Sequence, residues 1–65
     1  MVLNENDCVM LMDEYVELGL HRGDIGTVVR ANQRAHLYEV EFENSRVASL
    51  PEEVLRPADD YDSSA

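Results

Sequence analysis

Residues 37–43 read Leu-Tyr-Glu-Val-Glu-Phe-Glu, and this stretch decides the fold class. Large apolar side chains alternate in it with acids: Tyr38, Val40 and Phe42 with Glu39, Glu41 and Glu43. Successive side chains of a strand point to opposite faces of its sheet, so the alternation predicts a strand with one apolar face and one solvated face. We therefore expect a mostly β chain whose antiparallel sheet faces water on one side.

Four further strands are predicted where apolar or β-branched runs are bounded by turn residues, at residues 7–12, 25–30, 47–50 and 55–57. Gly26 lies inside the second of these and suggests a bulge or a sharp bend. Residues 51–55 predict one short helical turn, because proline precedes two acids there. The expected fold is a small sheet of about five antiparallel strands with that single turn.

A hairpin turn is predicted directly after the deciding strand. A two-residue loop would point Leu50 outward, whereas a three-residue loop ending in a bulge at Arg46 turns Ala48 and Leu50 inward. The second register buries the larger residue against Phe42 and Val40, and it is preferred.

Residues 13–20 form a long connection whose structure the sequence leaves open. Tyr15 and Leu18 would share a helical face, whereas Val16, Leu18 and Leu20 would share a strand face. Gly19 disfavours a helix that continues past it. These four apolar side chains either cover the open end of the fold or form an exposed patch that pairs subunits.

The length of 65 residues allows one domain, predicted at residues 1–57, followed by an acidic, disordered tail at 58–65. A core of this size is marginal, which makes self-association into a homo-oligomer attractive. The start of the chain lacks the basic and apolar regions of a signal peptide, and its longest apolar run is too short for a bilayer. A cytoplasmic protein without a membrane partner is expected.

Fourteen acids stand against five arginines, and the formal net charge is −9. Affinity for nucleic acids depends on cations that neutralise phosphates, so DNA and RNA are not expected as partners. The glutamate row at Glu39, Glu41 and Glu43 has two interpretations: a solvated strand face, or an acidic surface for a basic protein.

Side chains that could carry chemistry are few. The only cysteine, Cys8, is predicted to be a buried and inert thiol. His21 and His36 fall in predicted polar loops without the spacing of zinc ligands, and Asp24 is predicted to cap turn amides. No catalytic residue, metal site or cofactor is expected.

Four segments carry a pattern: Asp-Cys-Val-Met-Leu at 7–11, Gly-Leu-His-Arg-Gly-Asp-Ile-Gly-Thr-Val-Val at 19–29, Tyr-Glu-Val-Glu-Phe at 38–42, and the closing residues 50–55. Over residues 7–56 the chain resembles the small bacterial DUF4926-type proteins of uncharacterised function. The resemblance implies a compact SH3-like barrel of about five strands and no assigned chemistry. Residues 23–29 alone are also similar to the KOW-type half-motif of ribosomal and transcription-factor barrels, but this chain lacks the basic surface of those barrels.

The sequence thus predicts a non-catalytic small β-barrel that acts as a protein-interaction module and self-associates. The alternative is an acidic inhibitor or immunity-type protein that neutralises a basic partner. The candidate interaction residues are Glu39, Glu41, Glu43, Tyr15, Val16, Leu18 and Leu20.

Overall fold

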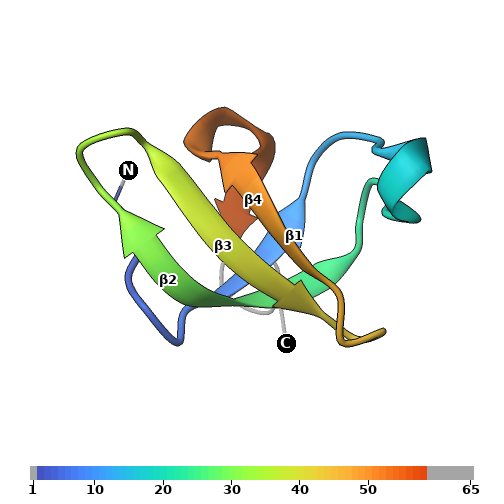
Figure 1. The fold of residues 1–65 in the computed structure, drawn as a ribbon, viewed down its shortest axis with the longest axis horizontal. Helices are drawn as coiled ribbons and strands as arrows, with labels where there is room; N and C mark the ends of the chain where they lie inside the picture. Colours follow the sequence, from blue (N-terminus) through green and yellow to red (C-terminus); the bar gives the residue numbers. More distant parts are fainter. Residues whose placement is uncertain (1, 59–65) are drawn as a thin grey trace.

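The computed structural model describes residues 2–58, which form five antiparallel strands in one sheet (Figure 1). The strands are β1 (Cys8–Leu11), β2 (Ile25–Asn32), β3 (Leu37–Phe42), β4 (Val47–Pro51) and β5 (Leu55–Pro57). Their order is β4-β3-β2-β1-β5, so the last strand returns to pair with the first. The prediction of a mostly β fold with five antiparallel strands is confirmed. The predicted tail lies outside the described residues, apart from Ala58.

Two 3-10 turns accompany these strands within residues 2–58, η1 (Val16–Leu18) and η2 (Glu52–Val54). The η2 turn follows Pro51, as the sequence predicts. The η1 turn is additional and favours the helical alternative, because Tyr15 and Leu18 both pack against the core, whereas Val16 is 74% exposed. Tyr15 and Leu20 form an isolated antiparallel bridge around it, and Gly19 ends it in the left-handed conformation with φ of 71°. None of the helical turns in this part of the chain has the length and apolarity that crossing a membrane requires.

The core lies on the apolar face of β3. Tyr38, Val40 and Phe42 are each at most 5% exposed, so the alternation is confirmed. The buried Tyr38 hydroxyl accepts a hydrogen bond from the Leu3 backbone N–H and donates one to Gln33 Oε1, both at 3.4 Å. The buried polar end of this side chain is therefore satisfied, which removes the cost of desolvating it.

The β3–β4 hairpin has the preferred three-residue loop. Phe42 donates its backbone N–H to the Arg46 carbonyl at 2.9 Å, and Ser45 takes a positive φ of 65°. The left-handed residue is therefore Ser45, one position before the bulge predicted at Arg46. Ala48 and Leu50 are buried as predicted, but Ala48 lies opposite Val40 and Leu50 opposite Tyr38, whereas the predicted register placed them against Phe42 and Val40.

The bulge of β2 is not at Gly26, which corrects the prediction. The register of β2 against β3 shifts between Val28 and Arg30. Gly26 instead permits close approach: a Cβ there would lie 2.6 Å from Val40 Cγ1 and 2.9 Å from the Glu41 carbonyl oxygen. The missing side chain thus lets β2 and β3 pack at a distance that no other residue allows.

Cys8 is exposed, which contradicts the predicted buried thiol. The pleat of β1 explains the difference, because Val9 and Leu11 point inward and leave Cys8 on the outer face. Cys8 lies opposite Thr27 on β2. An apolar run in the sequence identifies a strand but does not by itself tell which residue of the run begins the buried set.

Candidate functional site

The predicted glutamate row follows β3 on its outer face and then leaves the sheet. Glu39 is half-buried and lies between Arg30 of β2 and Ser49 of β4. Glu41 is exposed and lies between Thr27 and Val47. Glu43 opens the turn after the strand. The three glutamates, hereafter the β3 acidic row, thus meet different neighbours: a cation faces the first, and neutral side chains face the second.

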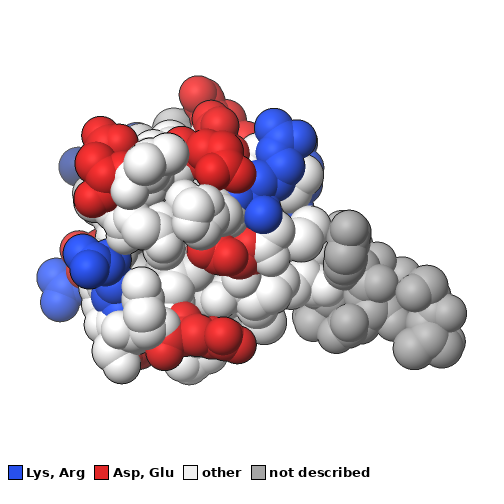
Figure 2. All heavy atoms as spheres, turned by 90° about the vertical axis from the view of Figure 1, so that its right-hand side faces the viewer, with Lys and Arg blue, Asp and Glu red and all other residues white. Residues whose placement is uncertain are grey.

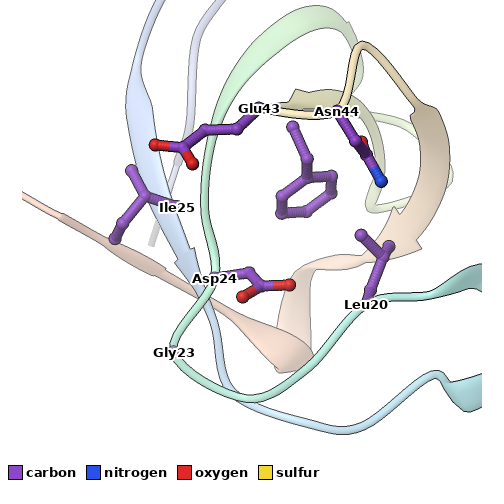
Figure 3. Close-up of a pocket in the computed structure, with 7 residues that line it drawn as sticks. Leu20, Gly23, Asp24, Ile25, Glu43 and Asn44 are labelled. Atoms are coloured by element: carbon purple, nitrogen blue, oxygen red, sulfur yellow. The ribbon is translucent and has the colours of Figure 1, made fainter.

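The third glutamate belongs to a hollow that the sequence did not predict. The loop before β2 approaches the β3–β4 turn and leaves a space of about 370 Å³, hereafter the Phe42 hollow (Figure 3). Its lining residues are Leu20, Gly23, Asp24, Ile25, Phe42, Glu43 and Asn44. Figure 3 shows the side chains of Leu20, Asp24 and Asn44 directed into this space. The two lining segments are separated by many residues in the chain, so no local pattern could have joined them.

The floor of the Phe42 hollow is apolar and its rim is acidic. Leu20 and Phe42 are core residues, exposed by only 1% and 5%, and Ile25 is a partly exposed wall. Asp24 lines the opening from the loop before β2, and Glu43 lines it from the turn after β3, with its carboxylate extending towards Ile25 in Figure 3. A second, shallower hollow of about 280 Å³ adjoins it, sharing Ile25, Phe42 and Glu43 and adding Glu41.

Hydrogen bonds in the loop hold Asp24 in place. Its carboxylate accepts the His21 backbone N–H at 2.9 Å, which confirms the predicted turn cap. Its carbonyl accepts the Leu11 N–H at 2.8 Å, and Gly23 donates its N–H to the Leu11 carbonyl at 2.7 Å. Gly23 takes a φ of 96°, a conformation that glycine adopts without strain. The rim carboxylate is thus fixed to the end of β1 rather than placed on a free loop.

A second carboxylate, that of Glu14, holds the same loop, and its contacts are hereafter the Glu14 clasp. Glu14 accepts the Arg22 backbone N–H at 3.0 Å and contacts the His21 ring nitrogen Nδ1 at 3.1 Å. These contacts, the Arg22 backbone hydrogen bond first and the His21 ring second, hold the pKa of Glu14 below its ordinary value. The pair formed by Glu14 and His21 is exposed, so its energetic value is small.

The four apolar candidates at the loop do not form one exposed patch. Leu20 lies in the core, and Tyr15 and Leu18 pack against that core. Only Val16 is well exposed, at 74%. The bridge between Tyr15 and Leu20 closes the loop onto the sheet, so the segment mainly covers one end of the core. Of the two interpretations that the sequence allowed, burial supports a segment that covers the end of the core, and Val16 is the one of the four candidates that is well exposed.

Both histidines are exposed loop residues, and each contacts a different glutamate. His21 Nδ1 lies 3.1 Å from Glu14, and His36 Nδ1 lies 3.4 Å from Glu52. The structure does not bring the two imidazoles together in one cluster, and residues 2–58 contain no group of three or more side chains that could hold a metal ion.

Charge on the side of η1 is arranged in separate groups. Figure 2 shows acidic groups on this face with uncharged surface between them. Asp24, Glu41 and Glu43 form no ion pair with any residue in the described range 2–58. Their charge is therefore not neutralised by contact within this part of the chain.

A family model described as a domain of unknown function, DUF4926, matches residues 5–57. The chain belongs to the DUF4926 family. The match confirms the family predicted from the four sequence segments and spans every strand from β1 to β5. No curated protein and no solved structure matches this DUF4926 chain. The five-stranded antiparallel sheet is confirmed, and the SH3-like relationship is not supported by any matching solved structure.

The two edges of the DUF4926 sheet are short and contain proline. β4 has five residues and ends at Pro51, and β5 has three and ends at Pro57. Short edge strands and proline both discourage pairing with a strand of another chain. An interaction of this protein is therefore expected to use side chains rather than the addition of a strand.

Proposed function

We propose that this DUF4926 protein is a non-catalytic interaction module that binds a basic protein through the acidic surface around β3. The observation that carries the proposal is the group of carboxylates at Asp24, Glu41 and Glu43, which lacks ion pairs within residues 2–58. Acids without ion pairs leave a negative field at this surface, and a cationic partner neutralises it. The same charge disfavours phosphates, so nucleic acids and anionic membranes are not proposed as partners.

The placement of the titratable groups supports a non-catalytic role. A nucleophile needs a base within hydrogen-bond reach, but both histidine rings contact glutamates rather than a hydroxyl or thiol. Cys8 lies opposite Thr27 on the outer face of the sheet. A cytoplasmic location remains part of the proposal.

Binding of a labelled peptide of alternating arginine and glycine tests the proposal, with fluorescence anisotropy at low and at high salt. We expect binding at low salt that is lost at high salt, since the screening length shrinks from about 10 Å at 0.1 M to about 3 Å at 1 M. Neutralising the β3 acidic row with Glu39→Gln, Glu41→Gln and Glu43→Gln should weaken binding about tenfold, if each pair contributes about 0.5 kcal/mol.

The matched control neutralises three exposed acids elsewhere, with Glu5→Gln, Glu17→Gln and Glu53→Gln. Both triple variants have the same net charge, so a difference between them reports position rather than total charge. Equal weakening in the two variants would mean that the peptide senses only net charge, and the proposed surface would be wrong.

Self-association is the second candidate, and one exposed side chain favours it. Val16 projects from η1 with 74% of its surface exposed, unlike the other apolar side chains of the loop, Tyr15, Leu18 and Leu20. If subunits pair there, light scattering should give a mass above that of the monomer, and Val16→Ser should lower it. A monomeric mass at every concentration would remove this candidate.

A further inference from the structure

We propose that the Phe42 hollow takes one arginine side chain of the basic partner. This inference rests on the proposed function and deepens it, because it names the residue type that the surface recognises. The hollow is at the lower end of the range of about 300–1,000 Å³ typical of ligand pockets, which suits a single side chain better than a cofactor.

The apolar floor of the hollow is suited to the methylene chain and the flat guanidinium face of an arginine. Ile25, 39% exposed, supplies most of the accessible apolar surface of the hollow, with small exposed parts of Leu20 and Phe42 beside it, and a long cationic side chain can cover such surface with its methylene groups. A guanidinium is also more weakly hydrated than an ammonium and is attracted to aromatic rings. The Phe42 ring is therefore a better neighbour for arginine than for lysine.

The acidic rim of the hollow complements the positive charge of the arginine. Asp24 and Glu43 reach the opening from two different loops, and neither forms an ion pair within the described residues 2–58. One carboxylate oxygen of Asp24 accepts the His21 N–H, and its other oxygen accepts no hydrogen bond from residues 2–58. The planar fork of a guanidinium can donate to two acceptors at once, which a lysine ammonium does in a less fixed geometry.

The adjoining hollow extends the surface for a neighbouring residue of the same partner. It shares Ile25, Phe42 and Glu43 with the first and adds Glu41 at its border. A basic segment that places one arginine in the Phe42 hollow would thus pass its next cation along β3. Charge complementarity selects this occupant, because an acidic or phosphorylated segment would meet three like charges.

The test uses three short blocked peptides that each hold one central residue between glycines: arginine, lysine or uncharged citrulline. Each is titrated into the ¹⁵N-labelled protein at low salt, and backbone amide shifts are followed by NMR. We expect the arginine peptide to shift the amides of Leu20, Asp24 and Asn44 most strongly. Citrulline has nearly the same shape without the charge and should bind at least about tenfold more weakly.

Asp24→Asn is the matching variant, because the amide oxygen of asparagine can still accept the His21 N–H that holds the loop. It should weaken the arginine response about threefold, whereas the isosteric control Glu53→Gln, remote from the lining, should leave it unchanged. Amide spectra of the variants without peptide report whether the fold is kept. Shifts spread over all acidic residues, or an equal response to lysine or citrulline, would overturn the inference.

The two proposals fail in different ways. If the arginine–glycine peptide depends on the β3 acidic row but the single-arginine peptide leaves the hollow unshifted, the inference is wrong and the proposed function stands. If that longer peptide ignores Glu39→Gln and Glu41→Gln, which do not line the Phe42 hollow, while the hollow still responds, the proposed surface is wrong and only the hollow remains.

Discussion

The β3–β4 hairpin and the loop between β1 and β2 differ in how their side chains are assigned to the core. In the hairpin, a residue's face follows from its neighbours, since inward Tyr38 and outward Glu39 alternate along one strand. In the loop, burial follows from closure: the bridge from Tyr15 to Leu20 turns a residue that could have been exposed into part of the core. Local pattern determines the first region, and long-range contact determines the second.

The largest expected effect tests whether the loop is part of the core. Leu20→Ala should lower the free energy of unfolding by about 3 kcal/mol, because it removes most of a side chain that is only 1% exposed. Val16→Ala, in the same loop but exposed, should change it by no more than about 0.5 kcal/mol. Urea unfolding measures both. Similar small changes in the free energy of unfolding for the two variants would show that the loop is not packed onto the sheet. The contrast drawn between the hairpin and the loop would then be wrong.

A core of this size supplies only about 3–5 kcal/mol of net stability, so Leu20→Ala can leave the chain largely unfolded. Leu20→Val removes less volume, so this variant stays folded enough for its free energy of unfolding to be measured. Its cost should fall between those of the two alanine variants.

The same contrast between the hairpin and the loop decides how much of the structure the sequence predicts. The strand over residues 37–42, its buried face and the length of the hairpin loop follow from alternation and turn chemistry, but the position of that loop and the pairing of Ala48 and Leu50 do not. The site was found only in part: Glu43 and Leu20 were candidates, but Asp24 and Phe42 were assigned to a turn and to the core. Their meeting at one hollow depends on how the loop folds back, which no periodicity encodes.

A second test concerns the close packing of β2 against the hairpin. Gly26→Ala should cost about 2 kcal/mol, since the added Cβ would overlap Val40 Cγ1 and the Glu41 carbonyl. Denaturant unfolding of Gly26→Ala, Val40→Ala and the double variant measures the coupling. The double variant should cost less than the sum of the two, because removing the Val40 methyl groups relieves one of the two overlaps. Strict additivity would show that the two residues do not compete for the same space.

The smallest effect lies in the loop and concerns the Glu14 clasp. The folded-state pKa of Glu14 is held below its ordinary value, chiefly by the Arg22 backbone N–H. A depressed carboxyl pKa means that the clasp stabilises the fold above the unfolded pKa and that this stabilisation is lost as the pH falls through the folded pKa. An NMR titration of the Glu14 carboxyl carbon measures the direction.

His21→Ala separates the two contributions to that shift. Removing the ring should raise the pKa of Glu14 only part of the way, because the Arg22 backbone hydrogen bond is the larger cause and stays in place. A complete return to the ordinary value would mean that a side-chain pair, not the closed backbone, fixes this carboxylate. The loop would then be held by surface charge, and the contrast with the backbone-directed hairpin would be sharper than the hydrogen bonds indicate.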